Sequence, residues 1–356
     1  MVSPLGGLAA QVNVVCTNTP SDDEAINAAS NASEVGDEIV IDGPCLINGT
    51  IRLVGQRTYR GQNASGTVIR QAAGANLAAL LASDTWLSGA TYTGNPITLR
   101  DLTLDGNAAA NTGRATDGVV LMSWNSTVEG LTIQNMRGSG IRLTNTSSTG
   151  TTLTNTQVNG RITHNFITDS GQYGIYVQDS GNSCTDWDLM DNWIADSGRQ
   201  GIRLENAAGW KVTGNHVYGV KEHAIYAARL FGTTIANNYI EDFGASTTAG
   251  TWYGINATVQ GDAGSVISGN KVFNFAGESN ASSRYVYLGI SQVNYGTGFV
   301  TVEGNLIRGV GSASSTGLSY QKDGGASLSV VSTGNLVTGV TTPRAVGTGV
   351  TVTTGL

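Results

Sequence analysis

The sequence has little of what long helices and basic surfaces require. Of its 356 residues, only 13% are charged and only 5 are proline. Glutamate and lysine, which favour helices, are scarce, so a mainly helical fold is not expected. The formal net charge of -7 lacks the basic excess that nucleic-acid binding needs. No apolar run reaches the roughly 18 residues of a transmembrane helix, so we expect no membrane partner.

Glycine is abundant, with 49 copies, and threonine, asparagine and short runs of valine and isoleucine recur along the chain. These residues favour short strands joined by tight turns. Hydrophobic residues make up 40% of the chain, which is enough to form a packed core. The composition therefore predicts an all-β protein.

The three cysteines fall in two places. Cys16 and Cys45 flank a predicted helix, and the sequence is compatible with a disulfide between them or with two free thiols. Cys184 lies within a repeat and is expected to be a small buried residue.

A phrase recurs along most of the chain: an asparagine, any residue, an aliphatic residue, a few polar residues, a glycine and a short strand. The shortest spacing between copies is 23 residues, from Asn215 to Asn238. A repeat of this length with three short strands is typical of a parallel β-helix, in which stacked coils bury a common core. The copies begin at Asn165, Asn192, Asn215, Asn238, Asn270, Asn305 and Asn335.

Apolar and polar residues alternate in the strand after each glycine, which indicates a strand with one buried face. Ile175 with Val177, and Ile202 with Leu204, are predicted to point inward. The recurring asparagine is predicted to bond the same amide on the next coil, about 4.8 Å away. We interpret this ladder as structural and not catalytic.

Residues 21–33, SDDEAINAASNAS, predict an amphipathic helix that begins with serine and aspartate. Such a helix is expected to cap the open end of the solenoid. We divide the chain into residues 1–50, an N-terminal cap with the first coil, and residues 51–356, the parallel β-helix. The C-terminal GTGVTVTTGL shows no second cap, so that edge is expected to be bare in a monomer or paired in a homotrimer.

These features resemble the pectate lyase superfamily, which includes secreted polysaccharide lyases, C5-epimerases and phage tailspikes. The resemblance is carried by SDDEAINAASNA, by EIVIDGPCLINGTIRLVGQRTYRGQNASGTVI and by the later NxI…GI coils, and it covers nearly the whole chain. It implies a single-stranded right-handed parallel β-helix, a polysaccharide ligand and a secreted, extracellular or virion-surface location. It does not imply one reaction, because the same fold carries several chemistries.

In this superfamily the substrate groove usually follows the outer face of the strand after glycine. On five successive strands the outward side chains are Arg142, Tyr176, Arg203, Tyr226 and Asn256. Gln178 and Glu205, two residues after Tyr176 and Arg203, are also expected to point outward. The preceding turns add Asp169, Tyr173, Asp196, Arg199, Lys221, Glu222 and His223. Arginine binds a carboxylate bidentately, so this wall predicts an acidic sugar polymer. The alternative is a solvated face whose charges pair with one another.

The aromatic residues and histidines divide by position. His164 and His216 adjoin ladder asparagines and are expected to be structural, whereas His223 lies beside the groove and is a candidate acid or base. Trp252 and Tyr253 fall in a predicted inserted turn. They are expected either to form a wall on which sugars stack or to pack on their own coil.

Three functions follow from the groove, and the first is β-elimination or C5-epimerisation of a uronate polymer. Its roles divide among six residues: Arg203 or Arg199 to neutralise the carboxylate, Lys221 or His223 as base, and Tyr176 or Tyr226 as acid. The sequence contains no acidic cluster typical of a calcium site and no R-x-P-x-x-R phrase. We therefore expect no cofactor, and the one alternative, a calcium ion, has no support in the sequence.

The second function is glycoside hydrolysis, which requires two carboxyl groups across the scissile bond. Asp169 and Asp196 occupy equivalent turns on adjacent coils, with Glu205 and Glu222 near them. Stacked carboxylates raise the pKa of one of the pair, as an acid catalyst requires, although Asp-Ser-Gly is also a common turn. The third function is binding without turnover, as in a tailspike or a surface adhesin.

Overall fold

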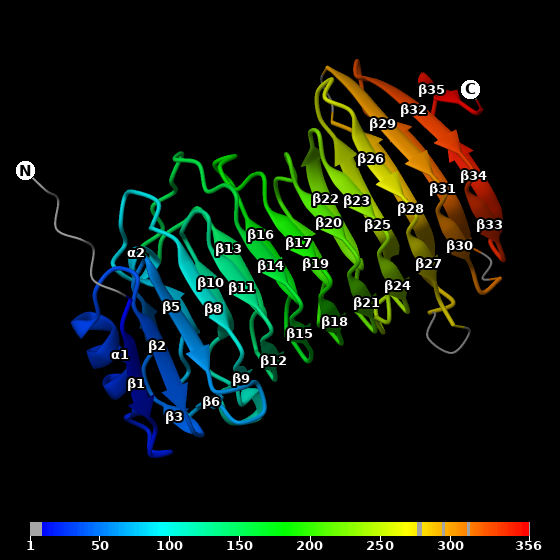
Figure 1. Cartoon of the computed structure of the whole chain (residues 1–356). Helices are drawn as coiled ribbons and strands as arrows, with labels where there is room; N and C mark the ends of the chain where they lie inside the picture. Colours follow the sequence, from blue (N-terminus) through cyan, green and yellow to red (C-terminus); the bar gives the residue numbers. More distant parts are fainter. Residues whose placement is uncertain (1–8, 276–279, 294–295, 312–313, 356) are drawn as a thin grey trace, which may run out of the picture.

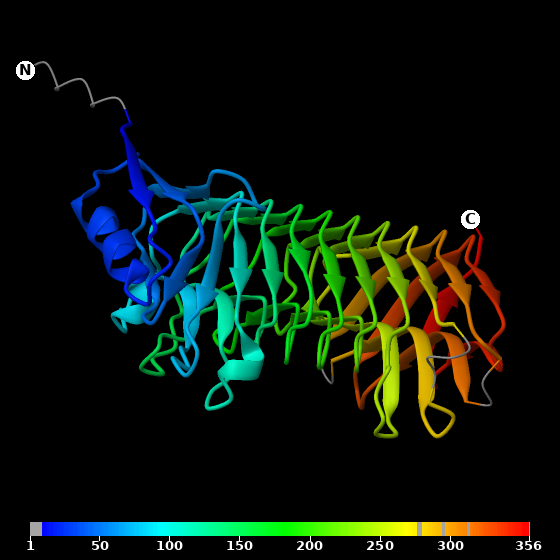
Figure 2. The same cartoon turned by 90° about the horizontal axis from the view of Figure 1, so that it is seen from below.

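The computed structural model describes residues 9–275, 280–293, 296–311 and 314–355. Its strands form three parallel sheets of 13, 11 and 11 strands, which run side by side along the molecule and enclose one core (Figures 1 and 2). Most coils contribute one strand to each sheet, and crossovers between parallel strands are right-handed as a rule. The predicted parallel β-helix is confirmed.

Sheet A comprises β1 (Gln11–Val15), β2 (Glu38–Asp42), β5 (Arg57–Gly61), β8 (Ile97–Arg100), β11 (Thr127–Glu129), β14 (Arg161–Thr163), β17 (Asp188–Met190), β20 (Lys211–Thr213), β23 (Thr234–Ala236), β26 (Ser265–Ser268), β29 (Thr297–Glu303), β32 (Ser327–Thr333) and β35 (Val350–Thr353). Sheet B comprises β3 (Cys45–Ile47), β6 (Val68–Gln71), β9 (Thr103–Asp105), β12 (Thr132–Gln134), β15 (Phe166–Ile167), β18 (Trp193–Ala195), β21 (His216–Tyr218), β24 (Tyr239–Glu241), β27 (Lys271–Phe273), β30 (Leu306–Arg308) and β33 (Leu336–Thr338). Sheet C comprises β4 (Ile51–Leu53), β7 (Ala79–Ser83), β10 (Asp117–Leu121), β13 (Ile141–Thr144), β16 (Ile175–Gln178), β19 (Ile202–Leu204), β22 (Ile225–Leu230), β25 (Thr251–Val259), β28 (Arg284–Gln292), β31 (Ser315–Lys322) and β34 (Thr342–Val346).

The core consists of aliphatic side chains stacked in columns from coil to coil. In sheet B, Ile194, Val217 and Ile240 pair in register and are fully buried. The predicted inward residues of sheet C, such as Ile202 and Leu204, are also fully buried. Burying one such side chain stabilises a fold by about 1.5–3 kcal/mol. Repeating this on every coil stabilises the solenoid without a globular centre.

The recurring asparagines form the predicted ladder at the turn between sheets A and B. The Nδ2 group of Asn192 donates to Oδ1 of Asn215 at 2.9 Å, and Asn215 donates to Asn238 at 3.0 Å. The same Nδ2 groups also donate to backbone carbonyls of the preceding coil, for example from Asn215 to Leu189 at 3.0 Å. These amides are buried, so each hydrogen bond also prevents an unsatisfied polar group.

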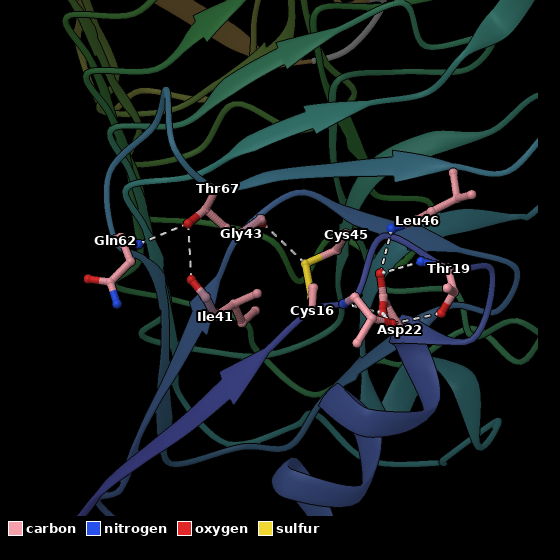
Figure 3. The surroundings of a disulfide bond; sticks show 10 residues. Cys16, Thr19, Asp22, Ile41, Gly43, Cys45, Leu46, Gln62 and Thr67 are labelled. Atoms are coloured by element: carbon pink, nitrogen blue, oxygen red, sulfur yellow. Dashed lines mark hydrogen bonds between the residues drawn. A yellow bond between two sulfur atoms is a disulfide. The ribbon is translucent and has the colours of Figure 1, made fainter.

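Helix α1 (Asp22–Ala32) covers the N-terminal end of the stack (Figure 1). It is fixed by a buried carboxylate, since Asp22 accepts hydrogen bonds from the backbone N–H groups of Thr19 and Leu46 (Figure 3). A disulfide joins Cys16 to Cys45 beside this carboxylate, and Cys184 is buried and free. Residues 9–50 supply helix α1 and also β1, β2 and β3, the first strands of sheets A and B.

The outer face of sheet B carries an aromatic column, formed by the residues that follow the ladder asparagines. Ring centroids lie 6.1 Å apart for Phe166 and Trp193, 4.2 Å for Trp193 and His216, and 4.6 Å for His216 and Tyr239. His164 lies in the adjoining turn with an exposed side chain. Both histidines are therefore on a different wall from sheet C.

The C-terminal strands β33, β34 and β35 are the last strands of sheets B, C and A (Figure 1). Large apolar side chains such as Leu336 and Val346 are exposed there. Pairing of this edge in a homotrimer remains a prediction. Across the residues that the structure describes, no helix has the length and apolar character needed to cross a bilayer.

Candidate functional site

The outer face of sheet C brings the predicted groove residues into one row. The strand register aligns Arg142 with Tyr176, Tyr176 with Arg203, Arg203 with Tyr226, and Tyr226 with Asn256. Neighbouring members are one coil apart, about 4.8 Å. The alternation after each glycine therefore predicted this row correctly.

Arg203 lies at the centre of a cluster of polar and aromatic side chains. Its guanidinium group lies 4.9 Å from the ring centroid of Tyr226 and 5.9 Å from that of Tyr176. Glu205 Oε1 lies 3.4 Å from Arg203 Nη2 and accepts the Tyr176 hydroxyl at 2.8 Å. Burial and the bond to Glu205 raise the pKa of Tyr176, so this phenol keeps its proton at neutral pH. We name Tyr176, Arg203, Glu205 and Tyr226 the Arg203 cluster.

Beside this cluster, Arg199 is held by two partners. It donates from Nη1 to the Tyr173 hydroxyl at 2.6 Å and from Nε to Glu222 Oε1 at 3.2 Å. Tyr173 is buried, and its ring centroid lies 4.6 Å from that of Tyr176. The guanidinium groups of Arg199 and Arg203 lie 5.2 and 5.6 Å from the Tyr173 ring centroid. Tyr173 therefore supports the arginines from beneath instead of lining the groove.

His223 borders the Arg203 cluster, with its ring 6.1 Å from that of Tyr226 and nearly parallel to it. Its Nδ1 accepts the backbone N–H of Tyr253 at 3.3 Å, so the neutral ring carries its hydrogen on Nε2. Burial, reinforced by the positive charges of Arg203 and Arg199, lowers the pKa of His223 to about 4. The imidazole is therefore uncharged at neutral pH and has a hydrogen-bond donor available.

At the N-terminal end of the row, Arg142 is held by a partner that the sequence argument missed. Its Nε lies 2.9 Å from Oδ2 of Asp117, and its Nη1 donates to Gln178 Oε1 at 3.3 Å. Asp117 precedes Gly118 as Tyr173 precedes Gly174, so the repeating glycine was a usable signal.

Asp169 and Asp196 lie together, but at the turns that follow β15 and β18 of sheet B. Both have left-handed φ values, +52° and +51°, in which aspartate is tolerated. Burial and then repulsion from Asp169 raise the pKa of Asp196, while the charge of Lys221 opposes this rise. Asp169 and Asp196 line a surface hollow whose described lining includes no member of the Arg203 cluster. Lys221 lies near enough to Asp196 for its charge to act on that carboxyl.

The predicted inserted turn around Trp252 and Tyr253 is wrong, because both residues lie in strand β25. The strand begins before Gly254, since its pairing with β28 extends to Thr251. Trp252 Nε1 donates to Ser283 Oγ at 3.2 Å, and its ring packs partly against the core. Tyr253 holds His223 through its backbone N–H. Through these contacts, Trp252 and Tyr253 pack on neighbouring coils.

Metal-ligating side chains do not gather at the groove. Among the residues that the structure describes, the one group of three close ligand types is Cys16, Asp22 and Cys45, and its two cysteines form the disulfide. The three histidines lie apart: His164 and His216 on the sheet B side and His223 on the sheet C side. These residues do not fit a copper or zinc centre built on imidazole and thiolate.

Fold and site together define a right-handed parallel β-helix with one polar wall that combines arginine, tyrosine and carboxylate. The chain has the fold of the pectate lyase-like superfamily. A family model described as "Periplasmic copper-binding protein (NosD)" matches residues 147–281, which is less than half of the chain. No curated protein matches the sequence.

Several solved structures share the fold at low sequence identity. The A-module of mannuronan C-5 epimerase AlgE4 from Azotobacter vinelandii has a TM-score of 0.62 at 18% identity, covering 96% of this chain and 100% of that one. The Dettilon tailspike protein has a TM-score of 0.56 at 14% identity, covering 93% of this chain and 65% of that one. DFA-IIIase from Arthrobacter chlorophenolicus A6 has a TM-score of 0.56 at 13% identity, covering 96% and 92%. Identities this low establish the fold alone.

Proposed function

We propose that this protein is a secreted or surface enzyme that removes the C5 proton of a uronate in an acidic polysaccharide, as a C5-epimerase or a lyase. The observation that carries the proposal is the position of Arg203 between Tyr176 and Tyr226, with Glu205 bonded to Tyr176. The epimerase named among the similar structures is consistent with it. An acidic polysaccharide is thus the proposed partner.

The chemistry requires a cation at the sugar carboxylate, because removing the C5 proton sends negative charge onto that group. Arg203 is suited to this role, since guanidinium binds carboxylate bidentately and its charge does not depend on pH. The Arg203 side chain is partly exposed, so a ligand can reach it. Arg199 lies over the same tyrosine and adds a second positive charge.

Proton transfer is assigned to the two tyrosines. The Tyr176 oxygen takes the C5 proton while its own phenolic proton passes to Glu205, which already accepts that hydrogen bond. Tyr226 lies on the other side of Arg203. In epimerisation its hydroxyl gives a proton to C5 from the opposite face, and in elimination it gives that proton to the departing glycosidic oxygen. Either way, one proton is removed and one is returned.

In this scheme His223 is not the base, although the sequence made it a candidate for that role. With a pKa of about 4 and Nδ1 occupied, it is a weak base at neutral pH. Its Nε2–H is available to donate to a sugar hydroxyl or carboxylate beside Tyr226. We therefore assign His223 to positioning the substrate.

Glycoside hydrolysis at Asp169 and Asp196 is the second candidate. The raised pKa of Asp196, beside a second carboxylate, is what an acid catalyst needs. A hollow of about 470 Å³ adjoins both residues. The left-handed turn conformation also explains both aspartates without a reaction, so we rank this candidate second.

The deciding experiment is incubation with mannuronan, polygalacturonate and a neutral glucan in D₂O. A lyase produces the ultraviolet absorbance of an unsaturated uronate, whereas an epimerase incorporates deuterium at C5 with inversion. New reducing ends without absorbance indicate the hydrolase, and binding without change indicates an adhesin. Arg203→Ala should slow C5 chemistry at least about 100-fold, while Arg161→Gln on sheet A removes one positive charge from another wall and should leave the rate unchanged. C5 chemistry at the wild-type rate in Arg203→Ala would refute the assignment.

A further inference from the structure

A polar pocket of about 220 Å³ opens on the N-terminal side of the Arg203 cluster. Its lining includes Arg114, Asp117, Arg142, Gln172 and Tyr176. Tyr176 belongs to both the pocket and the cluster, so the two are continuous. Arg142 and Arg203 are two coils apart in one row, about 10 Å at 4.8 Å per coil. A polymer bound along the groove crosses this span and continues over the pocket.

Arg142 forms a fixed wall of the pocket. Its guanidinium group lies 5.2 Å from the ring centroid of Trp86, which belongs to the short helix α2 (Asp84–Leu87). Asp117 forms an ion pair with its Nε, and its Nη1 donates to Gln178. A side chain with three such contacts has already lost its rotamer freedom, so little more is lost when a ligand binds.

The charges of the pocket do not cancel. Asp117 is buried, accepts the backbone N–H of Ser139 at 2.7 Å and pairs with Arg142. Burial raises the pKa of Asp117, and the charges of Arg142 and, less strongly, of Arg114 oppose this rise, so the exposed Arg114 lies near this carboxyl. Within the described residues, Arg114 has no acidic partner within 4.0 Å. Two guanidinium groups therefore face one carboxylate, and the excess is one positive charge.

We infer that this pocket is a second carboxylate-binding subsite, which takes another uronate of the same polymer, on the side of Arg203 that faces the N-terminal coils. Arg114 contacts the carboxylate of that sugar, and Arg142 forms the rigid back of the subsite. The inference rests on the proposed function, because it assigns the same groove to a polymer of acidic sugars. It predicts that the protein distinguishes a run of uronates from a uronate with uncharged neighbours.

The test is a calorimetric titration with an oligomannuronate hexamer, an oligogalacturonate hexamer and the methyl-esterified form of each. Arg114→Gln should weaken binding of the acidic hexamer roughly tenfold, as expected for one charge-assisted contact. Binding of the esterified hexamer should not change. Arg114→Lys keeps the charge and should restore most of the affinity, and Arg161→Gln on sheet A is the matched control for loss of one charge. Arg114 is exposed, so its substitution leaves the fold intact.

Arg142→Ala is a poorer test, because it leaves Asp117 buried without its ion-pair partner and risks unfolding. Arg203→Ala separates the remaining outcomes. If Arg203→Ala abolishes binding of the acidic hexamer and Arg114→Gln binds like the wild type, the subsite is refuted and the proposed function stands. If the wild type binds acidic and esterified hexamers equally, both the subsite and the uronate function are refuted.

Discussion

Two rows of side chains run along this molecule, and they differ in how the sequence repeats. In the ladder between sheets A and B, each coil from Asn165 to Asn335 places the same residue at the same point. In the row on sheet C, Arg142, Tyr176, Arg203, Tyr226 and Asn256 occupy equivalent positions with different chemistry. The position that carries the same residue on every coil is therefore structural, whereas the position whose residue changes from coil to coil forms the candidate site.

The difference has a physical origin. A buried amide bonds to its neighbours above and below only if those neighbours are also amides, so one exception leaves polar groups unsatisfied. The sheet C row faces solvent, where no such constraint applies. Mixed side chains there produce local pairs, such as Glu205 with both Tyr176 and Arg203.

The largest expected effect is from Asn215→Ala in the middle of the ladder. Asn215 donates to Leu189 and Asn238 and accepts from the backbone and side chain of Asn192. Its loss leaves several buried groups unsatisfied, at about 1–3 kcal/mol each, so the free energy of unfolding should fall by roughly 4 kcal/mol. Denaturant titration measures this.

The control for this prediction is Asn335→Ala at the last rung. Asn335 is only partly buried, so the fall should be about 1 kcal/mol. Equal effects at both rungs would contradict the account of the ladder as a chain of buried amides.

The second effect is from Arg203→Ala in the sheet C row. The activity, kcat/KM, should fall at least about 100-fold, or roughly 2.7 kcal/mol, because the uronate carboxylate loses its counter-charge. The free energy of unfolding should change by less than about 1 kcal/mol, since the side chain is partly exposed. Arg203→Lys, which keeps the charge but not the planar fork, should be intermediate. A stability loss as large as that of Asn215→Ala would erase the distinction between the rows.

The third effect concerns pH and His223, which borders the sheet C row. Its pKa is about 4 in the folded protein and about 6.5 in the unfolded chain. Between these values the unfolded chain binds more protons, so stability falls as the pH decreases from about 6.5 towards 4. From pH 7 to pH 5 this contributes a loss of about 2 kcal/mol, which His223→Gln should remove. His164→Gln, at an exposed position on another wall, should keep the wild-type slope. Parallel pH curves for wild type and His223→Gln would contradict the buried, neutral ring.

The sheet C row could be read from the sequence because alternation after each glycine sets which side chains point outward. That argument placed Arg203 between Tyr176 and Tyr226. It did not predict the pair Asp117–Arg142, because alternation indicates the direction of a side chain and not its partner on the next coil. It also could not foresee the pKa of His223, which depends on burial and on a backbone contact from Tyr253, thirty residues further along. Trp252 was predicted to lie in a turn because each strand was expected to start at its glycine, whereas this strand already pairs with its neighbour from Thr251, before Gly254.

The smallest effect is expected from Lys221→Gln, and it tests which wall carries the chemistry. The sequence made Lys221 a candidate base, but the structure places its charge beside Asp196. If the Arg203 cluster removes the C5 proton, kcat/KM on a uronate polymer should stay within about twofold, and stability within about 0.5 kcal/mol. The pKa of Asp196 should rise further, since Lys221 opposes its elevation. NMR titration of the Asp196 carboxyl measures that rise, and steady-state assay on mannuronan or polygalacturonate measures the activity. A fall of tenfold or more in activity would move the reaction to the Asp169–Asp196 side and favour the hydrolase.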